Sequence, residues 1–445
     1  MDKVKIIATI GPASDNEKEI EKMLQEGASI FRLNLSHASK SYVIRVMKAI
    51  NKAKTKLKKE AVLFLDLPGP KIRTGPLPAG KLDIKEGKVY SFGPEGEIPV
   101  SEKIVKSVDI KQRILLSDGK IELKPLKRDG RNILVKALNS ATLLSRQSVN
   151  ASGLVYETKY PTQKDIEGIR FGLKHGITTF AISFVSDKKD VLNVRKIAGK
   201  DVVIISKIER KDAVDNFEDI AKVSDIIMIA RGDLGLNMDI AKVPEIQEKL
   251  IMSANKLSKP VIVATQMLES MTTEIMPTRA EVDDVFTAIS EGADAVMLSE
   301  ETAIGQHPSA AVKMLEHIIS LSKPTPSSKN YPVIDERDAL IDSAVSLINK
   351  TKIKDAVVLT KSGRSAFRLA RFRLGVRIFA ISDSKSVLHA LAFGRGITPI
   401  RIKKLGSYPA EPLKQIMAEN RLRRVVLISG LETSSRSKES IRIIE

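Results

Sequence analysis

The chain has 445 residues, 73 Lys and Arg against 54 Asp and Glu, and neither Cys nor Trp. The lack of Cys excludes disulfide scaffolds, thiolate zinc sites and cysteine nucleophiles, and a hydrophobic content of 42% excludes an intrinsically disordered chain. No stretch approaches the roughly 18 apolar residues of a spanning helix, and the first residues enter a strand-like run without a signal sequence. We therefore expect a globular, cytoplasmic protein of about three domains.

The net charge of +19 predicts an anionic partner. Three kinds of partner fit this charge: nucleic acid, an anionic membrane and anionic small molecules. Residues 323–445 hold 24 basic and 11 acidic side chains, so 13 of the surplus positive charges lie there. A Lys-rich solvated surface of the thermophile type explains the same numbers. Aromatic residues make up only 4% of the chain and no nucleic-acid-reading motif is present, so we do not expect nucleic acid as partner. Because no stretch is suited to span a bilayer, we do not expect a membrane either.

Eight short apolar runs alternate with helical patterns in the first 322 residues. The runs are Lys5–Ile10, Ser29–Leu33, Ala61–Leu67, Thr178–Phe184, Val202–Ile208, Asp225–Ala230, Pro260–Ala264 and Ala295–Leu298. Between the first two, residues Asn16–Glu26 place Ile20, Met23 and Leu24 on one helical face. This alternation predicts a parallel sheet, either closed as a (β/α)₈ barrel or open and doubly wound.

Residues 68–151 interrupt this alternation. They contain short strands and turn pairs such as Glu86-Gly87, Asp118-Gly119 and Asp129-Gly130. The pattern predicts a small β domain inserted after the third strand and hinged as a lid. The first domain then comprises residues 1–67 and 152–322.

A Pro- and Ser-rich segment at residues 322–335 is typical of a linker. A second α/β domain, residues 323–445, is predicted by four further apolar runs. These are Ala356–Thr360, Ile378–Ser382, Thr398–Ile402 and Val425–Ser429.

Polar side chains gather at the predicted carboxyl ends of the first domain's strands, where barrel enzymes hold their catalytic groups. They are Arg32, Asn34, Asp66, Lys207, Glu209, Asp233, Thr265 and Ser299, and Gly232 beside Asp233 lets a ligand approach the backbone closely. Lys207 and Glu209 lie two apart on one face, and their burial is costly unless they are paired or used. Carboxylates that suit Mg²⁺, together with cations and hydroxyls, favour phosphoryl transfer. The structural alternatives are a buried salt bridge and helix caps, and a P-loop is absent.

Nine segments together resemble the pyruvate kinase family over essentially the whole chain. They are Lys5–Gly11, Arg32–His37, Asp66–Gly75, Ser206–Glu209, Val214–Phe217, Ala230–Gly235, Ala264–Ser270, Gly292–Ala303 and Thr360–Ser365. The resemblance implies a (β/α)₈ A domain, an inserted β-barrel B domain that closes over the site, and an α/β C domain. It implies phosphoryl transfer from phosphoenolpyruvate to ADP, giving pyruvate and ATP, with Mg²⁺ or Mn²⁺, in a homotetramer.

The resemblance also implies roles for the charged residues. Glu209 and Asp233 would hold the divalent metal. Lys207 would stabilise the phosphoryl group during transfer, and Arg32 would contact the phosphoryl group of phosphoenolpyruvate.

The neutral residues of the site receive roles in the same way. Gly232 and Thr265, with Asp233, would hold the carboxylate end of the substrate. Thr265, together with Ser299 and water, would assist protonation of the enolate.

A nucleotide site is implied for one segment and one arginine. Its residues would be Asn34, Leu35, Ser36, His37 and Arg73.

Potassium-dependent members of the family have a Glu where this chain has Lys71. Their potassium ligands correspond to Asn34, Ser36, Asp66 and Leu67. Because a lysine ammonium is itself a monovalent cation, we expect catalysis without potassium.

The C-domain loop matches the family's effector site. Its residues are Thr360, Lys361, Ser362, Gly363, Arg364 and Ser365. Hydroxyls, two bases and a glycine that lead into a helix predict a phosphate cradle and regulation by a phosphorylated effector. The alternative is a vestigial strand-to-helix turn.

Three other readings of the whole chain compete with a kinase. One is a carbon–carbon lyase barrel, which would lack both the inserted domain and the Arg32–His37 segment. Another is a basic nucleic-acid-binding protein, and the third is an inactive metabolite sensor. The complete set of site residues argues against the sensor.

Overall fold

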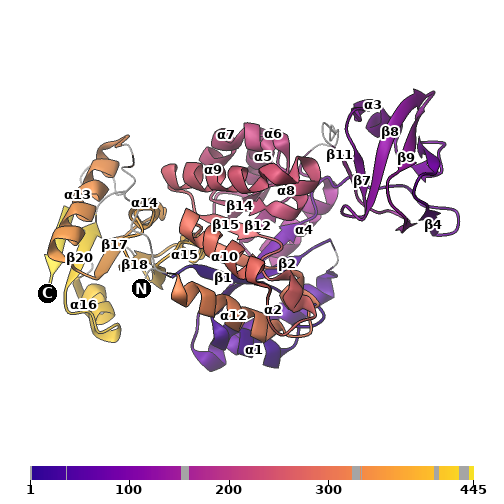
Figure 1. The fold of residues 1–445 in the computed structure, drawn as a ribbon. Coiled ribbons are helices and arrows are strands. Elements are labelled where there is room, and N and C mark those ends of the chain that lie inside the picture. Colours follow the sequence, from indigo (N-terminus) through magenta and orange to yellow (C-terminus); the bar gives the residue numbers. More distant parts are fainter. Residues whose placement is uncertain are drawn as a thin grey trace.

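The computed structural model describes residues 3–36, 38–151, 160–322, 331, 333–404, 410–429 and 440–445. Three parts follow one another in space, with a barrel between an inserted β domain and a C-terminal α/β domain (Figure 1). Within the described residues, no helix is long and apolar enough to cross a membrane. Most of the expected linker, residues 323–330 and 332, lies outside the described residues.

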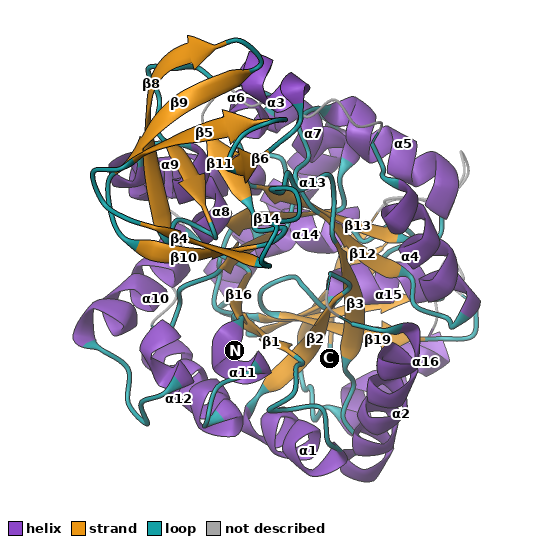
Figure 2. Cartoon of the chain, turned by 90° about the vertical axis from the view of Figure 1, so that its right-hand side faces the viewer, coloured by secondary structure: helices purple, strands orange, loops and turns teal. Residues whose placement is uncertain are grey.

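All eight strands expected in the first domain are present. They are β1 (Lys5–Thr9), β2 (Ala28–Asn34), β3 (Val62–Leu67), β12 (Thr179–Ile182), β13 (Val203–Ile208), β14 (Ile226–Ala230), β15 (Val261–Ala264) and β16 (Ala295–Leu298). They form a closed barrel in the order β1-β16-β15-β14-β13-β12-β3-β2, with parallel neighbours throughout. Of the two predicted arrangements, the closed barrel is therefore correct (Figure 2).

Helices cover the outside of the barrel. They are α1 (Glu17–Glu26), α2 (Lys40–Leu57), α4 (Gln163–Lys174), α5 (Lys188–Ala198), α6 (Lys211–Asp215), α7 (Phe217–Val223), α8 (Arg231–Asn237), α9 (Val243–Lys256), α10 (Arg279–Glu291), α11 (Glu300–Ala303) and α12 (Pro308–Leu321), with 3₁₀ turns η1 (Ile240–Lys242) and η2 (Glu269–Thr272). In α1, the Asn16 side chain accepts a hydrogen bond from Glu19 N, and the left-handed Gly27 ends the helix. The predicted apolar face of α1 is buried.

The inserted segment folds as a separate β domain with its own apolar core. One sheet has the order β11-β7-β8-β9-β5-β6, and β10 pairs with β4 in a second. The elements are β4 (Lys81–Ile84), β5 (Val89–Gly93), β6 (Ile98–Pro99), α3 (Glu102–Ser107), β7 (Ile114–Leu116), β8 (Ile121–Asp129), β9 (Asn132–Ala137), β10 (Ala141–Leu144) and β11 (Val149–Ala151). Ile84 of β4 and Leu143 of β10 share the core with the larger sheet, so the two sheets form one unit.

One turn of the inserted domain contacts the barrel helix α8. Lys71 Nζ lies 2.9 Å from Asp118 Oδ1 of this turn and 3.8 Å from Asp233 Oδ1 of α8. Gly119 has φ +87°, and a Cβ built on it would lie 2.8 Å from Leu236 Cδ2, so glycine suits both the turn and its close approach to α8. The inserted domain thus meets the barrel through an ion-paired lysine and a close backbone contact.

The C-terminal domain is built on a sheet of order β19-β18-β17-β20-β21. Its elements are α13 (Glu336–Thr351), β17 (Asp355–Leu359), α14 (Arg364–Ala370), β18 (Arg377–Ser382), α15 (Lys385–Leu391), β19 (Ile397–Arg401), α16 (Ala410–Glu419), β20 (Val425–Ser429) and β21 (Ser440–Ile444). Four strands match the predicted runs. The antiparallel edge strand β21 was not predicted, because Ser440–Ile444 carries a charge in the middle of a short run.

The C-terminal domain closes the end of the barrel opposite the carboxyl ends of its strands. Phe393 packs with the residues that fill the barrel interior, and its ring centroid lies 6.1 Å from that of Phe64. Around this contact, the buried Asp294 Oδ1 accepts hydrogen bonds from Arg373 Nη1 at 2.9 Å and from Arg395 N at 3.0 Å. The end of the barrel at the amino termini of its strands is therefore closed by an aromatic side chain and by the contacts of two arginines with one buried aspartate.

His389 of α15 is predicted to make this docking sensitive to acid. Its Nδ1 lies 3.1 Å from Thr178 Oγ1 of the barrel, and burial, with Lys385 and Lys54 against the weaker effect of Glu60, lowers its pKa to about 4. The neutral form is favoured when folded, so its stabilisation is complete above pH 6.5 and is lost as the pH falls toward 4, by at most about 3 kcal/mol.

We expect the melting temperature of the wild type to fall more steeply between pH 6.5 and 4 than that of His389→Gln, which does not titrate. The check is thermal unfolding of both proteins over this range. Parallel curves would contradict the prediction.

We also predict that Lys71→Met loosens the contact between the inserted domain and α8. Loss of a partly buried ion pair should speed amide hydrogen exchange in residues 114–121 and 231–237 by about two- to tenfold. Lys85→Met, an exposed lysine of the same domain, is the matched control. Mass spectrometry of exchange measures both, and equal exchange in the two variants would contradict the prediction.

Candidate active site

Four charged side chains are buried together at the carboxyl ends of β2, β3 and β13. They are Arg32, Asp66, Lys207 and Glu209, and their side chains are at most 13% exposed. The cluster balances two cations with two carboxylates. Since an unpaired buried charge is strongly destabilising, each member depends on the others for its place.

Lys207 is at the centre of this cluster. Its Nζ lies 2.7 Å from Glu209 Oε1 and 3.4 Å from Asp66 Oδ1, and it donates a hydrogen bond to Ser183 Oγ at 2.8 Å. Burial favours the neutral amine, but Asp66 and Glu209 outweigh it and hold the pKa of Lys207 above its usual value. Lys207 is therefore a permanent cation inside the barrel mouth.

Arg32 is held on both sides. Its Nε donates to Asp66 Oδ2 at 2.7 Å and its Nη1 donates to Thr9 Oγ1 at 3.2 Å. Thr9 in turn donates to Leu298 O at 2.8 Å. For Asp66, burial acts to raise the pKa, but Lys207 and Arg32 prevail and lower it, so this carboxylate stays charged.

Glu209 and Asp233 are the carboxylates that suit a divalent cation. Glu209 Oε2 accepts from Phe184 N at 2.6 Å, while its Oε1 pairs, within the described residues, with Lys207 alone. Burial raises the pKa of Glu209; Lys207 opposes this, and the nearby charge of Asp233 adds to it. Because the carboxylates of Glu209 and Asp233 repel each other, a hard divalent cation bound between them would stabilise both.

No group of three or more His, Cys, Asp or Glu side chains suited to a metal occurs in the described part of the chain. A cation between Glu209 and Asp233 would therefore complete its shell with substrate oxygens and water, as Mg²⁺ commonly does.

Thr265 occupies a strained position beside Gly232. Its φ is +71°, which is unfavourable for a β-branched residue. The next residue, Gln266, also has a positive φ, of +53°. Thr265 Oγ1 accepts from Gly232 N at 2.8 Å, and Arg231 Nη2 donates to the carbonyls of Thr265 and Gln266 at 2.8 and 3.0 Å. The arginine stabilises the turn that presents the threonine hydroxyl.

Ser299 follows β16 at the same rim. Its N donates to Glu301 Oε2 at 2.6 Å. Its Oγ is buried and has no hydrogen-bond partner among the described residues, so this hydroxyl is available to a reactant or to water.

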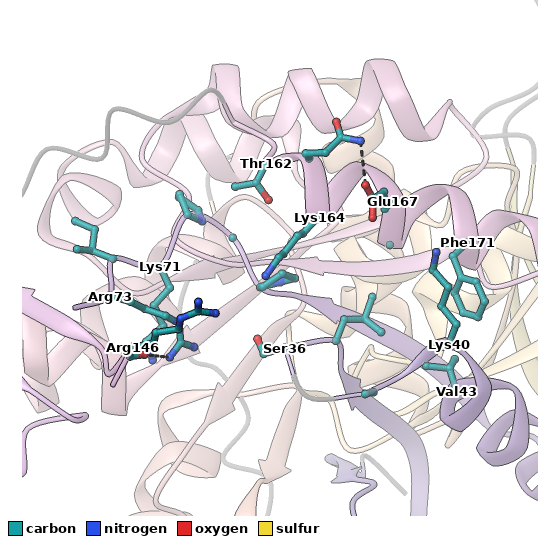
Figure 3. Close-up of a pocket in the computed structure, with 18 of the residues that line it drawn as sticks. Ser36, Lys40, Val43, Lys71, Arg73, Arg146, Thr162, Lys164, Glu167 and Phe171 are labelled. Carbon is teal, nitrogen blue, oxygen red and sulfur yellow. Dashed lines mark hydrogen bonds between the residues drawn. The ribbon is translucent and has the colours of Figure 1, made fainter. Parts of the chain in front are cut away.

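A cleft of about 1160 Å³ opens between the barrel mouth and the inserted domain. Leu35, Ser36 and Arg73, expected to face a nucleotide, all line it. Basic side chains line it on several sides, with Arg73 beside Arg146 and Lys164 pointing between them and Lys40 (Figure 3). Such a cleft is suited to an anionic ligand.

The other two residues expected to face a nucleotide are Asn34 and His37, and Asn34 is not among the residues that line the cleft. Asn34 Oδ1 accepts from Ser36 N at 3.0 Å and so shapes the turn after β2. His37 lies outside the described residues.

Three of the four expected potassium ligands, Asn34, Asp66 and Leu67, already have partners. Asp66 binds Arg32 and Lys207, and Leu67 O accepts from Ser183 Oγ at 2.8 Å. Lys71 makes its ion pairs with Asp118 and Asp233. Its ammonium therefore adds positive charge beside one predicted metal ligand.

The loop Thr360–Ser365 connects β17 to α14 at a distance from this cluster (Figure 1). Gly363 has φ +83°, its N donates to Thr360 Oγ1 at 2.8 Å, and Arg364 Nε donates to Ser362 Oγ at 3.2 Å. The loop is thus closed by its own hydroxyls.

Three residues that organise the site were not predicted: Thr9, Ser183 and Arg231. Ser183 follows β12, and a polar residue at a strand's carboxyl end is the signal that identified the others. Thr9 at the end of β1 and Arg231 directly after β14 carry the same signal, but their partners Arg32 and Thr265 lie far away in sequence, so only the fold shows what they bind.

The chain matches two family profiles. The one described as the pyruvate kinase barrel domain matches residues 1–312, and the one described as the pyruvate kinase alpha/beta domain matches residues 338–444.

Individual proteins give the same result. The pyruvate kinase of Thermococcus litoralis is 37% identical over 418 residues, covering 89% of this chain and 88% of that protein. The Thermotoga maritima pyruvate kinase is 33% identical over an alignment of 465 residues covering all of both chains. A crystal structure of a Cryptosporidium parvum pyruvate kinase matches with a TM-score of 0.91 at 29% identity, covering 100% of this chain and 96% of that one. These matches, with the closed barrel and its buried charge cluster, show that the chain belongs to the pyruvate kinase family.

Proposed function

We propose that the charge cluster around Lys207 carries out the reaction of this family, phosphoryl transfer from phosphoenolpyruvate to ADP, which gives pyruvate and ATP. The observation that carries the assignment is a permanently charged, buried lysine between the carboxylates of Asp66 and Glu209. Phosphoryl transfer develops negative charge on oxygens of the moving group, and a fixed cation stabilises it.

Each charged residue receives a role from its position. Lys207 meets the transferring phosphoryl group, and Arg32, fixed by Asp66 and Thr9, binds the same group in the substrate. Glu209 and Asp233 hold Mg²⁺ or Mn²⁺, which neutralises phosphate charge when bound. The anionic ADP occupies the basic cleft near Ser36 and Arg73.

Gly232 and Thr265, with Asp233, orient the carboxylate end of the substrate. The leaving enolate must gain a proton at carbon. Thr265 and Ser299 are the hydroxyls at the rim, and the Ser299 Oγ lacks a partner among the described residues, so it can order a water or pass on a proton.

Regulation and assembly remain predictions from the family resemblance. The loop Thr360–Ser365 has hydroxyls, a lysine and an arginine suited to a phosphorylated effector. A homotetramer is the expected assembly.

We predict that Lys207→Met lowers kcat by about 10³-fold, because it removes the fixed cation of the transition state. The assay follows pyruvate formation from phosphoenolpyruvate and ADP with Mg²⁺ or Mn²⁺. The matched control is Lys259→Met, a lysine at the opposite end of the barrel whose Nζ donates to Ser224 O at 2.6 Å. Absence of turnover in the wild type, or equal kcat in both variants, would refute the assignment.

We predict further that potassium is not required. The Lys71 ammonium supplies positive charge near Asp233, and Asp66 is already neutralised by Arg32 and Lys207. Addition of about 100 mM K⁺ to a Na⁺- and K⁺-free assay should change kcat less than about twofold. Lys71→Glu should make kcat dependent on K⁺. Strong activation of the wild type by K⁺ would contradict this prediction.

A further inference from the structure

Ser183 follows β12 and is 3% exposed, and its hydroxyl joins the ends of three barrel strands. The oxygen accepts a hydrogen bond from Lys207 Nζ of β13 at 2.8 Å. Its single proton faces two acceptors of β3, Leu67 O at 2.8 Å and Asp66 Oδ1 at 3.2 Å. Since that proton is directed toward β3, a lone pair of the hydroxyl is oriented toward the ammonium.

The ammonium of Lys207 has three N–H groups and three oxygen partners, one held by a hydrogen bond, to Ser183, and two by ion pairs. The partners are Glu209 Oε1, Ser183 Oγ and Asp66 Oδ1. To bind a phosphoryl oxygen, Lys207 must redirect one N–H while the others stay fixed. Glu209 is a predicted metal ligand, so Ser183 and Asp66 are the partners that remain to hold the ammonium.

The backbone of Ser183 is itself fixed. Its carbonyl accepts from Tyr160 Oη at 2.9 Å, and a Cβ on Gly69 would lie 2.6 Å from the same carbonyl oxygen. The next residue, Phe184, has φ +57° and donates its N–H to Glu209 Oε2. This fixed segment therefore directs the Ser183 hydroxyl at Lys207 and the Phe184 N–H at Glu209.

We propose that Ser183 is a positioning residue for phosphoryl transfer: its hydroxyl sets the direction of the Lys207 ammonium toward the transferring group. This inference rests on the proposed function of Lys207. Ser183 need not touch the substrate, so its removal should lower kcat and leave substrate affinity nearly unchanged.

The test compares Ser183→Ala with Ser206→Ala. Ser206 precedes Lys207 on β13, is fully buried, and pairs with Ser224 Oγ at 2.7 Å, away from the charge cluster. Both variants lose one buried hydroxyl from the same barrel. We expect kcat to fall about 10- to 100-fold in Ser183→Ala, the size of a lost hydrogen bond to a charged group, with KM for both substrates within about threefold. Ser206→Ala should keep kcat within about twofold.

A double-mutant cycle separates positioning from a general structural effect. In the Lys207→Met background, measured in single-turnover experiments, Ser183→Ala should lower the rate less than about twofold more, because it acts through the missing lysine. A further loss as large as in the wild type would overturn the proposal.

Other outcomes are equally decisive. Full kcat in Ser183→Ala, or an equal loss in Ser206→Ala, would overturn the inference while the proposed function stands. A wild type without turnover would overturn the function itself. If Ser183→Ala does not fold, Ser183→Cys replaces it, since a thiol keeps the shape but accepts hydrogen bonds weakly; it should show lower kcat at unchanged KM, and full kcat would overturn the inference.

Discussion

The placement of an ammonium inside the mouth of a parallel barrel is the constraint on which the site depends. An isolated charge there would neutralise or destabilise the fold, so Lys207 requires Asp66 and Glu209 within ion-pair distance. Asp66 in turn orients Arg32. The barrel supplies these partners from β2, β3 and β13, and its closure fixes their spacing. The same pairs that permit burial also hold two cations where a phosphoryl group can meet them.

Three residues with left-handed backbone conformations lie beside this cluster. Phe184, Thr265 and Gln266 have positive φ values and lie at the carboxyl ends of β12 and β15. Such conformations persist only when their surroundings over-determine them. Glu209 binds the N–H of Phe184, and Arg231 binds the carbonyls of Thr265 and Gln266. Charged side chains thus fix the turns that present the neutral groups, and binding and scaffold functions are carried by the same residues.

Much of this arrangement could be predicted from sequence, because periodicity and strand-end chemistry are local signals. The eight apolar runs specify the barrel strands, and the spacing of Lys207 and Glu209 places both on one face. Local signals do not show which of these side chains pair with one another. Asp66 was expected near potassium, and only the fold shows it bound to Arg32 and Lys207. The strand β21 escaped prediction for a related reason: its pairing with β20 compensates for a weak local pattern.

The structure explains part of the positive charge of the C-terminal domain. Part of its positive charge is not surface charge at all: Arg371, Arg373 and Arg395 are buried where this domain meets the barrel. Arg373 binds Asp294, Arg371 donates to Ser258 Oγ, and Arg395 Nη1 donates to a barrel carbonyl. Guanidinium groups can satisfy several carbonyls at once while remaining charged, which suits them to cap an open barrel end. A basic composition in this domain therefore does not by itself imply an anionic ligand; only cations whose contacts leave them facing a cleft, as at the barrel mouth, carry that implication.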